Sequence, residues 1–254
     1  VYWLVIESER FNYVRQRLVV DVSSFGMIQV SVSLFPRTIE TGVDPVVDLA
    51  ALRADIPKKA LEKHEDALLE FQKENENRGI DRLNEALEIA PDFYDAHLDL
   101  GFAHQRAGRF ADAIASLERA VEFNPSSREG LSWLGRLYYE SDRFQDAVES
   151  LWKRIELGAA TGDDNFYIGS SYYKLGAFGE AEDSLLRSLL ISSEMAGPAR
   201  LQLFNVYMRS RQPFQALEQM DAYVVENPDD PNLEAYQKRA DDVRAMLNQG
   251  PPGR

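Results

Sequence analysis

Three histidines, two pairs of adjacent aspartates and one pair of adjacent serines could bind a metal or take part in a reaction. His97 and His104 are seven residues apart, so they share one face of a predicted helix and could contribute two ligands to a metal ion. No third ligand stands at a suitable spacing, and His64 lies on the other face of its helix without an evident partner. We interpret all three as structural histidines and predict neither a metal site nor a cofactor.

The acid and serine pairs do not form a catalytic set. Asp163-Asp164 and Asp229-Asp230 stand at predicted helix starts, where carboxylates stabilise free backbone amides. Ser170-Ser171 lies inside a predicted helix with no base beside it. The chain also lacks the G-x-x-x-x-G-K, H-E-x-x-H and G-x-S-x-G motifs of nucleotide-binding loops, zinc proteases and serine hydrolases. These observations predict a protein that is not an enzyme.

An internal repeat determines where these residues lie. Gly101, Gly135 and Gly169 are 34 residues apart. The same spacing relates three further sets, namely Ala113, Ala147 and Ala181; Leu83, Leu117, Leu151 and Leu185; and Phe110, Phe144 and Phe178. If each unit is numbered from its first residue, five units start at Ala60, Tyr94, Arg128, Gly162 and Gly197. Such a period is typical of stacked helical repeats.

The repeat has a physical explanation in helix packing. Positions 4, 7, 8 and 11 share one face of a first helix, and positions 20, 24 and 27 share one face of a second. Small residues at positions 8 and 20 let the two helices approach closely, and leucine at position 24 with an aromatic residue at position 11 fills the space between them. One helix pair cannot bury its apolar face alone, so neighbouring pairs must stack.

The motif L-G-x-x-[YH], followed by A-x-x-x-L-x-x-A and P, resembles the tetratricopeptide repeat family. In the second unit it comprises Leu100, Gly101, His104, Ala113, Leu117, Ala120 and Pro125. The resemblance implies a mainly α fold, a right-handed α-α superhelix of about five helix-turn-helix units over residues 58–230. An amphipathic helix over 231–248 would cap it, followed by a disordered tail, 249–254. Two departures should loosen the packing or alter the twist: Arg154 and Ser188 at position 27, and Ala159 and Ser193 at position 32.

Helix boundaries can also be predicted. Asp92, Ser127 and Thr161 precede the second, third and fourth units as expected N-terminal caps. Asp164 follows Thr161 at the spacing of a capping box. Pro57 suits the first turn of the opening helix.

The N-terminal residues differ from the repeats. β-branched and aromatic residues over 2–7, 11–22 and 27–35 predict a three-stranded antiparallel segment, followed by a connector over 36–57. Residues 1–35 resemble the closing strands of a carboxypeptidase regulatory-like β-sandwich module. The chain begins at Val1 directly in a predicted strand, so we expect a fragment or a processed form. The resemblance to modules that occur in bacterial envelope proteins favours the bacterial cell envelope, or periplasm, as the location, with the cytoplasm as the alternative.

Composition excludes several classes of partner. The chain has 254 residues, a net charge of −14 and no cysteine. The negative charge repels nucleic acid and anionic lipid, and the absence of cysteine excludes disulfides. No apolar run reaches the length needed to span a membrane, so we predict neither nucleic-acid binding nor membrane insertion.

The remaining candidate site is a surface of the first helices. In the family, positions 2, 5, 9 and 12 line a concave groove and position 13 borders it. We therefore predict a peptide-binding groove that contains Leu98, Phe102, Arg106, Arg136, Tyr139, Phe166, Tyr173, Lys174, Asn205 and Arg209. Whether its aromatic residues are exposed or packed stays open. The residues with which family members clamp a chaperone C-terminal carboxylate are absent, since Leu98, Phe102 and Trp133 occupy such positions.

These observations favour a non-enzymatic interaction scaffold that binds a protein or peptide partner in this groove. The alternative is an assembly module that forms homo-oligomers through the strands of residues 1–35.

Overall fold

The computed structural model describes residues 2–5, 17–20 and 55–248, and the chain divides into two compact units, residues 1–43 and 44–254. In the first unit, β1 (Tyr2–Val5) pairs antiparallel with β2 (Arg17–Val20). Both lie within the first two predicted strands. The third predicted strand, residues 36–54 of the connector and the tail lie outside the described residues.

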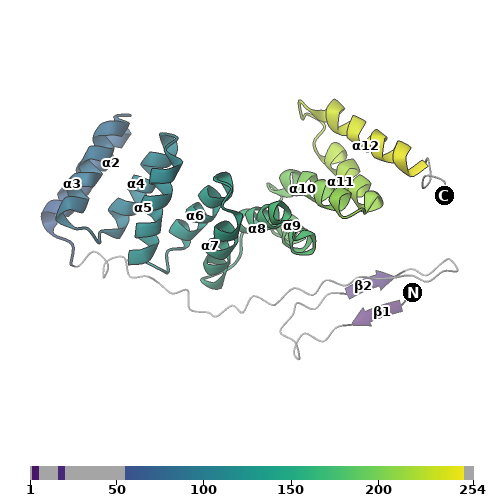
Figure 1. Ribbon diagram of the computed structural model, residues 1–254, viewed down its shortest axis with the longest axis horizontal. Coiled ribbons are helices and arrows are strands. Elements are labelled where there is room, and N and C mark those ends of the chain that lie inside the picture. Colours follow the sequence, from purple (N-terminus) through teal and green to yellow (C-terminus); the bar gives the residue numbers. More distant parts are fainter. Residues whose placement is uncertain (1, 6–16, 21–54, 249–254) are drawn as a thin grey trace. The chain divides into compact units, whose positions relative to one another are not determined.

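The second unit is an array of helices, and Figure 1 shows them following one another in chain order as pairs, with α12 after the last pair. The helices are α2 (Lys58–Gln72), α3 (Glu76–Ile89), α4 (Tyr94–Arg106), α5 (Phe110–Phe123), α6 (Arg128–Glu140), α7 (Phe144–Glu156), α8 (Gly162–Leu175), α9 (Phe178–Ile191), α10 (Ala196–Arg209), α11 (Pro213–Glu226) and α12 (Leu233–Asn248). The predicted mainly α fold of helix-turn-helix units is confirmed. Among residues 55–248, no helix combines the length and the apolar character needed to cross a membrane.

The close approach of paired helices follows from the residues at positions 8 and 24. A Cβ atom on Gly101 would lie 2.6 Å from Leu117 Cγ, and one on Gly135 would lie 2.3 Å from Leu151 Cγ. These separations are far shorter than the 3.5–4.0 Å at which carbon atoms attract one another. In these two units glycine is therefore required at position 8, because the leucine of the second helix occupies the space of its missing side chain. Ala67 and Phe204 stand at this position in the first and fifth units.

The turn inside each pair uses a left-handed residue at position 15. Gly108 and Gly176 have φ of 71° and 80°, and Glu74, Asp142 and Arg211 have φ of 62°, 59° and 59°. Glycine adopts this conformation freely, whereas other residues do so at a cost. The turn geometry thus recurs in all five units although its sequence does not.

Two of the three predicted caps are confirmed. Ser127 Oγ accepts a hydrogen bond from the Gly130 amide at 2.9 Å. Thr161 and Asp164 form a capping box. Asp92 is not a cap, because Phe93 stands between it and Tyr94, the first residue of α4, and no side-chain hydrogen bond caps this helix.

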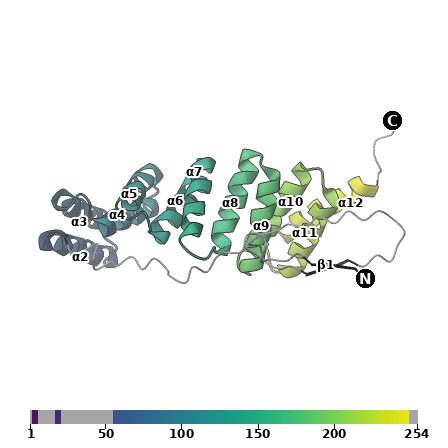
Figure 2. The same cartoon turned by 90° about the horizontal axis from the view of Figure 1, so that it is seen from below.

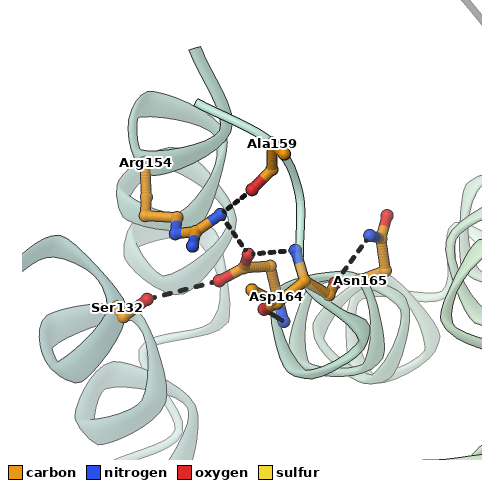
Figure 3. A network of polar contacts seen from close by, with 6 residues as sticks. Ser132, Arg154, Ala159, Asp164 and Asn165 are labelled. Carbon is orange, nitrogen blue, oxygen red and sulfur yellow. Dashed lines mark hydrogen bonds and ion pairs between the residues drawn. The ribbon is translucent and has the colours of Figure 1, made fainter. Parts of the chain in front are cut away.

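Polar contacts occupy the places where position 27 departs from alanine. Arg154 Nη1 lies 2.8 Å from Asp164 Oδ2 and also donates to the Ala159 carbonyl (Figure 3). Ser132 Oγ donates to Asp164 Oδ1 at 3.3 Å, which brings α6 into the same network. In the fourth unit, Ser188 Oγ donates to the Gly162 carbonyl at 2.8 Å. The departures are thus matched by specific hydrogen bonds and an ion pair.

The core continues between successive helix pairs, which Figure 2 shows side by side. At the C-terminal end, Ala240 and Val243 of α12 are buried in one cluster with Leu203 and Met220. The Tyr236 ring also packs edge-on against Tyr223, with the centroids 5.0 Å apart. Helix α12 therefore covers the apolar face of the last pair.

Candidate functional site

Aromatic side chains from the first helices of three successive units form two groups of contacting rings. The Phe102 ring of α4 lies 5.2 Å from Trp133 of α6, and Tyr139 of α6 lies 5.4 Å from Tyr167 of α8, between ring centroids. Phe166 packs edge-on against Tyr167 at 5.4 Å. We call these five residues the aromatic strip.

The strip rings are packed on one side and reach solvent on the other. Phe102, Trp133 and Tyr139 are half-buried against the core of the second and third units, and Phe166 is half-buried against the C-terminal core. Leu98, by contrast, is only 8% exposed and belongs to the core itself. The sequence left open whether the aromatic residues of the predicted groove are exposed or packed. The strip rings are half-exposed, whereas Leu98 is buried.

Arg136 lies between two rings of the strip. Its guanidinium carbon is 5.6 Å from the Trp133 centroid and 5.8 Å from that of Tyr167, within cation–π range. Arg136 Nε donates to Glu140 Oε1 at 3.0 Å, and this hydrogen bond raises the pKa of the Arg136 guanidinium. Burial raises the pKa values of the Tyr139 and Tyr167 phenols. At neutral pH the strip therefore holds neutral phenols around one charged guanidinium.

Arg106, at the α4 end, is also held by an aromatic ring and a carboxylate. Its guanidinium carbon lies 5.2 Å from the Phe71 centroid, and its Nη2 lies 2.8 Å from Glu76 Oε1. Two of the four predicted groove cations, Arg106 and Arg136, thus have their charges compensated within the array. The other two have different surroundings.

Lys174 and Tyr173 extend the site along α8. Lys174 is exposed, with Nζ 6.0 Å from the Phe144 centroid. Tyr173 is half-buried, and its ring lies 6.0 Å from that of Phe178. Neither residue contacts the aromatic strip directly through a ring pair, so both belong to the neighbouring surface.

On α10, a cation from α12 joins the predicted residues. Arg239 Nη2 donates to Asn205 Oδ1 at 3.1 Å, and its guanidinium carbon lies 4.6 Å from the Phe204 centroid. Arg209 is exposed and follows Asn205 by four residues, so the two share a helix face. Lys174, Arg209 and Arg239 are therefore alike in one respect. Among residues 55–248, none of these three cations forms an ion pair with a carboxylate.

Sequence reasoning missed three members of this surface. Trp133 and Tyr167 both stand at position 6, which lies about 40° from position 2 on the helix circumference. Their shared position and aromatic character could have identified them. Arg239 could not have been found this way, because its place depends on how α12 packs against α10.

The histidines serve packing. His97 Nε2 lies 2.8 Å from the Pro91 carbonyl oxygen, and its ring stacks on Phe123 at 5.5 Å. The expectation that His64 lacks a partner was wrong, since its Nε2 lies 2.6 Å from Asp99 Oδ2 of the next unit. No group of three or more potential metal ligands occurs within the described ranges.

A concave feature away from the strip lies between α5, α6 and α7. It is a hollow of about 180 Å³ lined by Glu118, Val121, Leu131, Leu134, Tyr138, Asp146, Glu149, Ser150 and Lys153. Most of its polar groups already have hydrogen-bond partners, and Asp146 and Glu149 accept from Arg143 and Gln145. Tyr138 donates to Glu118 at 2.7 Å, and Ser150 donates to the Leu131 carbonyl at 2.9 Å. The hollow therefore offers less unpaired chemistry than the surface around the strip.

Comparisons with known proteins agree with this architecture. The family model of the tetratricopeptide repeat matches residues 64–126 and 98–164. No curated protein matches the chain by sequence.

Three solved structures share this fold, although each is less than 25% identical in sequence to this chain. YrrB, a TPR protein with an unusual peptide-binding site, is 17% identical with a TM-score of 0.65, covering 76% of this chain and 98% of that chain. A MamA structure is 19% identical with a TM-score of 0.63, covering 67% and 93%. A tetratricopeptide repeat protein from Parabacteroides merdae is 17% identical with a TM-score of 0.65, covering 76% of both chains. Residues 64–164 thus match the tetratricopeptide repeat family, and the array of helix pairs has the fold of tetratricopeptide repeat proteins.

Proposed function

We propose that the chain is an interaction scaffold that binds a peptide segment of a partner protein along the aromatic strip, in the groove that the repeat family implies. The observation that carries this proposal is the makeup of the strip, whose half-exposed rings come from three successive units and form two groups bridged by Arg136. Half-exposed aromatic side chains grouped on one surface mark interaction sites more often than scattered apolar residues do. The peptide-binding site of YrrB, on the same fold, supports the same use of the array.

The strip is suited to apolar or aromatic peptide side chains. Its rings pack against the core on one side and contact neighbouring aromatic rings. Binding a ligand therefore costs little side-chain conformational entropy. Arg136 adds a fixed cation between Trp133 and Tyr167. Each well-packed aromatic anchor in an interface typically contributes on the order of 2 kcal/mol to binding.

A selection experiment tests the proposal without knowledge of the partner. The full chain is used to select binders from a random peptide library, and their affinities are measured by calorimetry. The double variant Phe102→Ala/Tyr139→Ala should weaken the selected peptides by about 100-fold or more, since two anchors are lost. Phe214→Ala is the matched control, because Phe214 is an aromatic residue of α11 that is 71% exposed and lies outside the strip. Equal affinities for the parent and the double variant would place the ligand elsewhere.

Oligomerisation through residues 1–35 stays a separate prediction. Sedimentation of the full chain and of a variant without these residues would test it, since the alternative requires a larger species that the deletion dissociates.

A further inference from the structure

We propose that carboxylate side chains of the bound peptide are recognised at the α8–α10–α12 end of the site, by Lys174, Arg209 and Arg239. This inference rests on the proposed function and specifies its ligand. The peptide would place apolar or aromatic side chains on the strip and an acidic run beside this basic cluster, which is defined by those three residues.

The cations at the two ends of the site differ in whether they already have a carboxylate partner. At the α4 and α6 end, Arg106 and Arg136 are each bonded to a glutamate, at 2.8 Å and 3.0 Å. These cations already have carboxylate partners, so a ligand carboxylate would have to compete for them. In the basic cluster, none of the three cations has such a partner within residues 55–248. The positive charge available to a ligand therefore lies at one end of the site.

Two cations of the basic cluster, Arg209 and Arg239, lie beside the face of α10 that carries Asn205. Asn205 of α10 accepts from Arg239 of α12, and the adjacent Phe204 ring lies under the same guanidinium. Arg209 stands one helical turn after Asn205 and so projects from the same face. Arg239 is thus held in place by a ring and an amide, neither of which neutralises its charge. A guanidinium held this way keeps donors available for a carboxylate.

The positive charge of the basic cluster is opposite in sign to the net charge of the protein. The chain carries a net charge of −14. Three exposed cations without carboxylate partners are therefore a local reversal of sign. Such a reversal attracts an acidic ligand to one end of the site and orients it during encounter. The ligand that fits this site is an apolar-acidic peptide, with side-chain carboxylates rather than a terminal one.

Synthetic peptides of defined charge test this inference. Each contains two tryptophans and a run of four aspartates, four asparagines or four lysines on either side of them, with acetylated and amidated ends. Binding to the full chain is measured by calorimetry at low and at moderate salt. In the better of the two orders, we expect the aspartate peptide to bind at least 10-fold tighter than the asparagine peptide, and the lysine peptide to bind weakest. Moderate salt should reduce this preference, because the recognising charges are exposed.

Two variants locate the preference. In Lys174→Gln/Arg209→Gln, which removes two exposed cations that make no ion pair, the aspartate-over-asparagine ratio should fall to below 3-fold. The matched control Lys59→Gln/Arg109→Gln removes the same charge from exposed residues of α2 and the turn before α5, and should keep the parental ratio. The affinity of the asparagine peptide should be similar in all three proteins, which also reports that each is folded.

The outcomes separate the two proposals. If the asparagine and aspartate peptides bind equally well, the charge inference is wrong while the strip proposal stands. A preference that survives in Lys174→Gln/Arg209→Gln also overturns it, as does an asparagine peptide with a free C-terminal carboxylate that binds as tightly as the aspartate peptide. If no peptide with tryptophans binds the parent, the proposed function and the inference both fail.

Discussion

Arg154 of α7 and Asp164 of α8 form an ion pair with a 2.8 Å separation, and their side chains are only 12% and 2% exposed. The same carboxylate accepts from the Thr161 amide at 2.7 Å and from Ser132 (Figure 3). Removing one partner of a buried pair leaves an uncompensated charge, which typically costs about 3–5 kcal/mol. We predict a destabilisation of this size for Arg154→Ala, measured by urea unfolding.

A matched control is Arg82→Ala, because Arg82 pairs with Glu85 on the surface and its side chain is 41% exposed. Exposed pairs contribute much less to stability than buried ones, because water and salt screen their charges. If Arg154→Ala costs no more than Arg82→Ala, the buried pair does not hold α7 against α8 as described.

The contact between Gly135 and Leu151 makes a second prediction. Gly135→Ala should destabilise by about 1–3 kcal/mol, because the new methyl group overlaps Leu151 and overpacking costs this much. Gly179→Ala in α9 should have the opposite sign, since nothing lies within 4 Å of the position its Cβ would occupy. Alanine there should gain up to about 1 kcal/mol from helix propensity. Thermal unfolding of both variants decides the matter, and equal signs would contradict the packing argument.

Position 15 provides a third test. Asp142 has φ of 59° in the turn between α6 and α7, whereas Gly108 has φ of 71° in the equivalent turn before α5. Left-handed backbone costs a non-glycine residue roughly 1–2 kcal/mol, although glycine also raises the entropy of the unfolded chain. Asp142→Gly should therefore raise the melting temperature, and Gly108→Ala should lower it. Melting temperatures that change in the same direction would show that the turns do not share this constraint.

Acidification should destabilise the array through His97. Burial lowers the pKa of His97 below its unfolded value of 6.5. The unfolded chain then binds more protons between the two pKa values, so the free energy of unfolding falls as pH drops through this window. His97→Gln, which can still donate to the Pro91 carbonyl, should reduce the loss of stability between pH 7.5 and 5.5. Urea titrations at both pH values measure it, and an identical loss in the variant would exclude His97 as a contributor.

The repeat period allowed accurate prediction where packing is local and obligatory. The glycine at position 8 and the caps Ser127 and Thr161 follow from spacing alone, because backbone geometry leaves few alternatives. The period could not predict the partners of long polar side chains. Arg136 reaches Glu140, and His64 reaches Asp99 of the next unit.

Such contacts depend on rotamers and on the angle between neighbouring pairs, neither of which a period encodes. Leu98 illustrates the same limit. Its position faces the expected groove, yet the side chain is buried in the core of the second and third units.

NMR signals of the tryptophan indoles can show whether a peptide binds along the aromatic strip, because the chain has three tryptophans at different places in the sequence. Trp133 belongs to the aromatic strip, whereas Trp152 lies on α7 near Tyr172, with its Nε1 3.4 Å from the tyrosine hydroxyl. Trp3 is identified with a Trp3→Phe variant. The full chain is labelled with ¹⁵N and titrated with a library-selected peptide. If the peptide lies on the aromatic strip, the Trp133 indole signal shifts in proportion to occupancy while the Trp152 signal stays in place. A Trp133 signal unchanged at saturation, with Trp152 or Trp3 shifted instead, would contradict it.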